Sequence, residues 1–243
     1  MKTKASRKKT RKTRLKPLSP AGKRRQKVAT RDKILEAAKR VFSEHPYSAA
    51  TIRMVGEEAG IDHPLITYYF PTKAELFEAV VEDTAESFVQ ASSSWYQGLE
   101  HLSVSKGFSL YLDRLLAFTS KHPEALGIAA VNLARPKGSE TVPGYKQMQW
   151  YLRRNTDTFR NFAPLRGSTR EIRIFVKTFN TMIINYLGAA TYHARTLGMN
   201  PGSPAYRKWV KDAMHFLFLP RLRELIYGED REASRVKRAA GSR

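Results

Sequence analysis

The sequence contains no cysteine among its 243 residues, so neither a disulfide framework nor a cysteine-ligated zinc site is possible. It also contains no apolar run that approaches the ~20 residues required by a membrane-spanning helix. Its first residues are strongly basic but lack the apolar stretch of a signal peptide. These absences predict a cytoplasmic protein with no membrane segment.

The sequence has no glycine-rich loop of the kind that cradles phosphate, and no group of His, Asp and Glu with metal-ligand spacing. The six histidines are scattered along the chain, at positions 45, 63, 101, 122, 193 and 215. We therefore assign no catalytic residue, no metal site and no cofactor, and we expect that the protein is not an enzyme.

Acidic residues are absent from residues 1–29, which hold thirteen of the 43 Lys and Arg residues. The rest of the chain carries 30 basic against 22 acidic residues, so most of the net charge of +21 belongs to this segment. With almost no apolar side chains, the segment is predicted to be a disordered basic arm. Such an arm either lies along DNA phosphates or in the minor groove, or is a solvated extension without specific contacts. Residues 229–243 are predicted to be a flexible tail.

No segment shows the pattern of a strand of consequence, whereas helical periodicity is frequent and 42% of the residues are hydrophobic. An all-α fold is predicted, with one folded domain over residues 30–76 and a larger one over residues 77–228. Thr30 is expected to cap the first helix, and the predicted helices include segments 33–43, 51–59, 63–70, 72–94, 168–197 and 204–226.

The stretch from Thr51 to Lys73 has the layout of a helix-turn-helix. Gly60 is placed to take the left-handed conformation that ends the first of its two short helices. Pro64 suits the first turn of the second helix, where no backbone N–H is needed. Ile66 and Phe70 give this second helix a buried stripe, and Tyr68 is expected to join Phe70 in the core. The N-terminal side chains of the second helix are then free to enter a DNA major groove.

The run TIRMVGEEAGIDHPLITYYFPTKAEL, starting at Thr51, resembles the DNA-binding signature of the TetR (tetracycline repressor) family of bacterial transcriptional regulators. The resemblance covers roughly residues 30–85. It implies a three-helix, helix-turn-helix DNA-binding domain followed by a helical domain for effector binding and dimerisation. Thr67 stands where the family usually has tyrosine, and Pro64-Leu65 where Gly-Thr or Gly-Ala is common.

The residues predicted to contact DNA combine the outward face of this motif with the positions that match the family. Arg53 and Lys73 are suited to contact phosphate, and Arg53 could instead contact guanine. Leu65 or Thr67 is suited to contact a thymine methyl group. Tyr69 suits a phosphate. The complete predicted set is Thr51, Arg53, His63, Pro64, Leu65, Thr67, Tyr69 and Lys73.

The last two long helices are too apolar to be covered by one subunit, which predicts a second copy packed against them. The resemblance implies the same homodimer, a palindromic double-stranded operator and a small-molecule effector inside the C-terminal helices. Aromatic and polar side chains that are candidates to line an effector cavity, or else ordinary core, are Phe108, Tyr111, Trp150, Tyr151, Phe179, Asn185 and Tyr186.

The leading interpretation is a homodimeric, sequence-specific repressor that a small ligand releases from DNA. One alternative is a basic protein that coats nucleic acid through its arm. Another is a regulator controlled by a protein partner without a small ligand. Activation instead of repression is also compatible with the sequence, because the sign depends on where the operator lies relative to the promoter.

Overall fold

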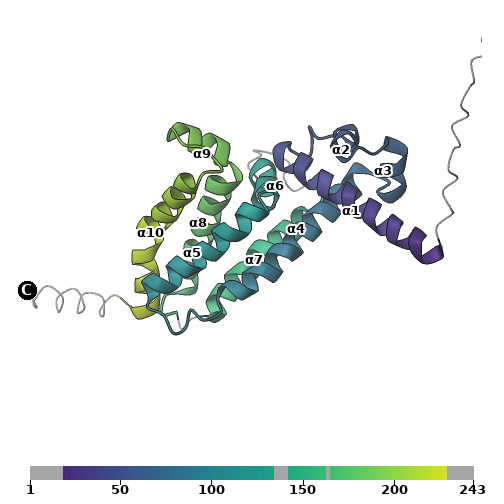
Figure 1. Ribbon diagram of the computed structural model, residues 1–243. Coiled ribbons are helices and arrows are strands. Elements are labelled where there is room, and N and C mark those ends of the chain that lie inside the picture. The colour runs from purple at the N-terminus through teal and green to yellow at the C-terminus, as the bar shows by residue number, and fades with distance from the viewer. Residues whose placement is uncertain (1–18, 134–141, 163–164, 229–243) are drawn as a thin grey trace, which may run out of the picture.

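The computed structural model describes residues 19–133, 142–162 and 165–228. Within these ranges the chain is helical and contains no strand, which confirms the predicted all-α class. Figure 1 shows a small group of helices, α1 to α3, beside a larger bundle of long helices that α4 joins to it. The helices are α1 (Pro20–Glu44), α2 (Ile52–Ala59), α3 (His63–Tyr69), α4 (Lys73–Trp95), α5 (Val104–Lys121), α6 (Glu124–Leu133), α7 (Tyr145–Phe162), α8 (Thr169–Ile183), α9 (Ala190–Thr196) and α10 (Pro204–Tyr227).

The core of the small domain forms where the apolar stripe of α1 packs against α2, α3 and the start of α4. Phe42 of α1 and Phe77 of α4 are both fully buried, and their rings meet edge to face at 4.8 Å between centroids. Ile66 and Phe70 are buried in the same cluster, as predicted. This shared core fixes the helix-turn-helix on the first turns of α4.

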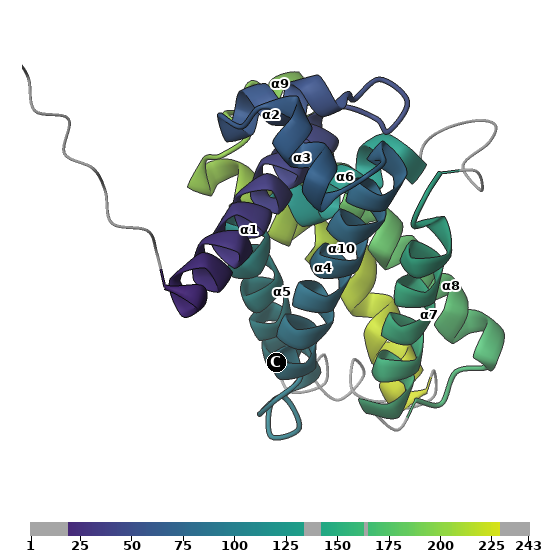
Figure 2. The ribbon, with the colours of Figure 1, turned by 90° about the vertical axis from the view of Figure 1, so that its right-hand side faces the viewer.

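The N-cap of helix α1 is Ser19, eleven residues before Thr30, so the expected N-cap at Thr30 is wrong. Ser19 caps the helix by accepting a hydrogen bond from the backbone N–H of Gly22 at 3.2 Å, and Pro20 occupies the first turn. Once tertiary packing holds the C-terminal half of a helix, adding Lys, Arg, Gln and Ala residues requires only propagation, which these residues favour. The first turns therefore extend past α2 and α3 into solvent (Figures 1 and 2). The rest of the predicted arm, residues 1–18, and the predicted tail, residues 229–243, lie outside the described residues.

The predicted long helix over residues 168–197 is interrupted. Helix α8 ends at Ile183, a π-helical segment follows over Ile184–Gly188, and α9 then begins at Ala190. Gly188 lies against α6 so closely that a Cβ there would be 2.4 Å from the carbonyl oxygen of Leu126. π-helical insertions of this kind shift the backbone locally, and here the shift accompanies the close approach to α6.

Helix α6 joins the two domains. On one side Gly127 packs against Ser43 of α1, where an added Cβ would lie 3.0 Å from the serine Cβ. Asn132, which is buried, accepts a hydrogen bond from the backbone N–H of Tyr47 at 2.9 Å. Because the opposite side of α6 packs on the π-helical segment, α6 connects the bundle to the small domain independently of α4.

Candidate nucleic-acid interface and effector cavity

The helix-turn-helix is built by local interactions that the sequence anticipates. Thr51 caps α2 by accepting a hydrogen bond from the backbone N–H of Met54 at 3.2 Å. Gly60 ends α2 in the left-handed conformation, with φ of 60°. Gly56 adds a contact that sequence reasoning missed, because a Cβ at this position would lie 2.8 Å from the carbonyl oxygen of Ile61. A glycine in the middle of so short a helix was the available signal for this close turn.

Helix α3 presents its N-terminal side chains to solvent. Pro64 lies in the first turn, and His63, Pro64, Leu65 and Thr67 are all exposed. The Thr67 hydroxyl donates a hydrogen bond to the carbonyl oxygen of His63 at 3.1 Å and also lies 3.5 Å from its Nδ1 atom. This contact turns the hydroxyl of Thr67 toward its own helix and holds it beside the imidazole of His63.

The two tyrosines of α3 differ in exposure, and Tyr68 is not in the core where the sequence predicted it. Tyr68, expected in the core, is 65% exposed, whereas Tyr69, expected to face DNA, is partly buried against the core of the small domain. Ile66 and Phe70 define the buried side of α3, and at 100° per residue Tyr68 points directly away from them. The prediction for Tyr68 failed because aromatic character was given more weight than helical position.

Tyr68 links α3 to the basic extension of α1. Its hydroxyl accepts a hydrogen bond from the Lys27 ammonium at 3.3 Å, and that ammonium lies 5.2 Å from the centre of the tyrosine ring. This contact places cations of α1 beside the exposed face of α3.

The two cationic side chains predicted to contact phosphate differ in their surroundings. The Arg53 side chain is 86% exposed, and its Nε donates to Glu57 one turn later at 2.9 Å. An exposed pair of this type contributes little to stability, typically about 0–1 kcal/mol, so a phosphate can replace the carboxylate. Lys73 instead donates to the carbonyl oxygens of Tyr47 at 2.8 Å and Ala50 at 3.0 Å.

The Lys73 ammonium also lies 4.4 Å from the centre of the Tyr47 ring. Two of the three N–H groups of this ammonium are hydrogen-bonded, so Lys73 connects the turn before α2 to the start of α4. Thr72 caps α4 by accepting from the backbone N–H of Glu75 at 3.1 Å. Together these contacts fix how α4 leaves the small domain.

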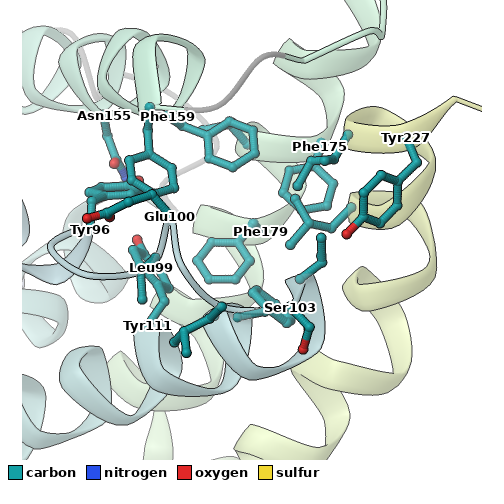
Figure 3. A pocket seen from close by; sticks show the side chains of 18 of the residues that line it. Tyr96, Leu99, Glu100, Ser103, Tyr111, Asn155, Phe159, Phe175, Phe179 and Tyr227 are labelled. Atoms are coloured by element: carbon teal, nitrogen blue, oxygen red, sulfur yellow. The ribbon is translucent and has the colours of Figure 1, made fainter.

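A cavity of about 320 Å³ lies inside the bundle, among α5, α7, α8, α10 and the loop that follows α4. Figure 3 shows Asn155 and Tyr96 at one end and Tyr227 at the other, with the rings of Phe175 and Phe179 between them. A second cavity of about 80 Å³ adjoins it, against α4 and α6.

Four of the seven residues predicted to line an effector cavity do so. Phe108, Tyr111 and Phe179 line the larger cavity, and Tyr111 and Tyr151 line the smaller one. Trp150, Asn185 and Tyr186 line neither of them.

The three residues that line neither cavity lie in other surroundings. Trp150 is 55% exposed and stacks on Arg154, while Asn185 is exposed and donates to the carbonyl oxygen of Thr181 at 3.0 Å. Tyr186 packs edge-on against Trp209. Residue type alone does not give the face of a helix, and near the π-helical segment the expected periodicity is also shifted.

The polar groups of the cavities include neutral amides and phenols, most of which sequence reasoning missed. The Asn155 side-chain N–H donates to the Asn180 side-chain oxygen at 3.1 Å. Burial raises the pKa of Tyr96 to about 12, and it raises the pKa values of Tyr111 and Tyr151 as well. These phenols therefore remain protonated near neutral pH.

Residues 34–80 match the family model described as bacterial regulatory proteins of the tetR family. This match covers α2, α3, the C-terminal part of α1 and the first turns of α4. The helix-turn-helix segment of this chain is thus similar to the DNA-binding segment of TetR-family regulators.

Two curated relatives are named as transcriptional repressors of the helix-turn-helix type. The transcriptional repressor AcnR of Corynebacterium efficiens is 36% identical over 66 residues, which are 27% of this chain and 35% of the relative. The transcriptional repressor NicS of Pseudomonas putida is 39% identical over 64 residues, 26% of this chain and 30% of the relative. The chain thus spans about a third of the length of these two curated relatives.

The similarity in fold to solved structures extends into the bundle. A crystal structure of a TetR-family regulator from Mesorhizobium loti superposes with a TM-score of 0.53, covering 80% of this chain and 97% of the other at 19% identity. At that identity the superposition shows the shared fold.

Helices α8 and α10 of the bundle carry exposed apolar side chains. Phe216 is 82% exposed, Ile174 55% and Leu217 45%. We call these three residues the α8/α10 face. Solvated apolar clusters of this kind mark surfaces that bind a partner.

In the part of the chain that the structure describes, no group of three or more His, Asp or Glu residues is arranged to hold a metal ion. Over the same residues, none of the helices combines the length and the apolar character needed to cross a bilayer.

Proposed function

We propose that this chain is a transcriptional repressor that binds a palindromic operator as a homodimer and is released from it by a small molecule. The observation that carries the proposal is the exposed N-terminal half of α3, held on a helix-turn-helix inside the segment that matches the family model. Two relatives named as repressors support repression over activation. We place the protein in the bacterial cytoplasm, where its DNA is.

Each part of the interface has a role in this proposal. Helix α3 enters the major groove, where His63 meets a base edge and Leu65 or the methyl group of Thr67 meets a thymine methyl. Thr51 and Arg53, at the start of α2, contact the phosphate backbone. Lys73 acts as a positioning residue, because its ammonium is engaged with the entering turn.

The α8/α10 face is the surface on which a second copy packs. Pairing two chains there removes Phe216, Ile174 and Leu217 from water and presents two copies of α3. A helix-turn-helix dimer reads half-sites about one turn of DNA apart, ~34–36 Å, or a multiple of this spacing. This geometry is the reason to expect a palindrome.

The cavities are the site of the effector. Helix α4 lines the smaller cavity and begins inside the small domain, so a ligand that favours another position of α4 changes the separation of the two copies of α3. Coupling of this kind is reciprocal and typically amounts to ~1–3 kcal/mol. DNA therefore weakens effector binding by the same factor.

Footprinting of the DNA upstream of the gene for this chain tests the proposal. The full-length chain should protect two symmetric half-sites, and His63→Ala should remove that protection while leaving salt-sensitive binding to random DNA. Lys33→Ala, a change at an exposed position of α1, serves as the matched control. A uniform footprint that His63→Ala leaves unaltered would instead favour a coating protein.

A further inference from the structure

The two cavities are neighbours that share part of their lining. Tyr111, Asn155 and Asn180 line both of them. Because the Asn155 and Asn180 side chains are hydrogen-bonded to each other, a polar amide pair lies where the cavities meet. A ligand in the larger cavity thus meets hydrogen-bonding groups on its way to the smaller one.

The lining of both cavities, over the described residues, contains no Lys, Arg or His. Its one carboxylate belongs to Glu100, whose side chain is 54% exposed in the loop after α4. A buried anion would have no cation to pair with and would lose its hydration, which is strongly unfavourable. The lining therefore suits a neutral molecule, and the predominance of aromatic side chains suits an aromatic or aliphatic body.

The smaller cavity contains a polar atom that lacks a partner. The hydroxyl oxygen of Thr84 is fully buried and has no hydrogen-bond partner among the described residues. Thr84 lines this cavity from α4. A buried hydroxyl without a partner is unusual and costly, and a ligand group that reaches it would satisfy it.

We propose that the effector is a neutral, largely apolar molecule whose body fills the larger cavity and whose hydrogen-bonding end passes the Asn155–Asn180 pair to reach Thr84. The contact with Thr84 acts directly on α4, the helix that carries the small domain. Release of DNA by this contact rests on the function proposed above, whereas binding in the cavities does not.

Two matched fluorescent probes test the predicted charge of the ligand on full-length protein without DNA. N-phenyl-naphthylamine is neutral, and anilinonaphthalene sulfonate is the same skeleton with an anionic group. The neutral probe should brighten on binding, and Val104→Trp, which fills the larger cavity from the first turn of α5, should weaken its binding about tenfold or more. The anionic probe should bind only cationic surface, so its signal should be the same with Val104→Trp.

Either of two results would overturn the assignment of a neutral ligand. The first is anionic-probe binding that is as tight as that of the neutral probe and equally sensitive to Val104→Trp. The second is a neutral probe whose signal does not depend on Val104→Trp.

Competition against the neutral probe tests the role of Thr84. Phenylhexanamide, whose amide lies at the end of a chain long enough to leave the larger cavity, should compete about tenfold better than phenylhexanoate. Thr84→Val keeps the shape of the side chain but removes the hydroxyl, and it should weaken phenylhexanamide about fivefold to tenfold. Thr84→Ser should retain that affinity, and neither variant should alter binding of the neutral probe itself.

Equal affinity of phenylhexanamide for the natural chain and for Thr84→Val would contradict the assignment of Thr84. A gel-shift measurement with phenylhexanamide separates site from function. Binding without release of DNA would support the cavity assignment and contradict the effector role proposed above.

Discussion

Among single residues, Lys73 connects the turn before α2 to the start of α4. Its ammonium donates to two backbone carbonyls of the turn before α2 and lies over the Tyr47 ring. Hydrogen bonds made by a charged group contribute about 1.5–3 kcal/mol each, so Lys73→Met should lower the free energy of unfolding by at least that amount. Chemical denaturation of the full chain measures it, with the exposed Lys33→Met as control.

The same pair of lysine variants separates a positioning role from a phosphate contact. If Lys73→Met left stability unchanged but lowered the salt dependence of DNA binding by about one ion, the ammonium would be a phosphate contact after all. Arg53→Ala should lower that slope by about one at unchanged stability.

Base recognition is also argued at the residue scale. Thr67→Ala removes the methyl group and the contact with His63, and it should reduce discrimination between operator and mismatched DNA by roughly 1–3 kcal/mol. Competition binding with operators altered at one base pair measures the loss. An equal loss of affinity for operator and for random DNA would remove Thr67 from the set of base contacts.

The buried phenols give stability a dependence on alkaline pH. An acid whose pKa is raised in the folded state contributes stability that is complete below its unfolded pKa and is lost as the pH rises through the folded value. For Tyr96 that window extends from the ordinary value of 10.0 to about 12. In Tyr96→Phe, the free energy of unfolding should therefore fall less steeply as the pH rises above about 10. Urea denaturation at a series of pH values measures this slope. An unaltered slope in this variant would place the alkaline loss in other groups.

At the scale of elements, glycines permit the close packing of α6 on two sides. Gly127 lies where α6 meets α1, and Gly188 lies where α6 meets the π-helical segment. Gly188→Ala would bring a Cβ within 2.4 Å of the Leu126 carbonyl oxygen, whereas at Gly202 the nearest atom would be 3.7 Å away. Overpacking of this type costs about 1–3 kcal/mol. Gly188→Ala should lower the Tm clearly, whereas Gly202→Ala should not. Similar Tm values for the two variants would show that the π-helical segment accommodates the added methyl group without loss of stability.

The elements that could be predicted from the sequence are those that nearby residues determine. The helix-turn-helix and its glycine turn were predictable because capping residues and apolar spacing determine them within a few residues. The start of α1 at Pro20 was not, because its extra turns have no apolar stripe and are held by the helix that follows. The π-helical break depends on contact with α6, and the amide pair of the cavity depends on how α7 meets α8, so neither has a local pattern.

At the scale of the whole molecule, dimerisation is assigned to the α8/α10 face. Phe216→Glu places a charge at its most exposed aromatic and should convert the dimer to monomer, with a loss of operator affinity of about tenfold or more. Trp150→Glu alters an aromatic that is also exposed but lies on α7, and it should leave both properties unchanged. Sedimentation and gel-shift titration measure them, and a dimer that survives Phe216→Glu would require another interface.

The central claim, that this chain reads a defined DNA sequence, is tested most directly by selecting genomic fragments that bind purified full-length protein at near-physiological salt. Affinity measured without control of salt would report mainly the basic charge of the chain. We predict enrichment of one palindrome whose half-sites lie one helical turn, or a multiple of it, apart. Recovery of fragments without any sequence preference would contradict the account and leave a basic protein that coats DNA.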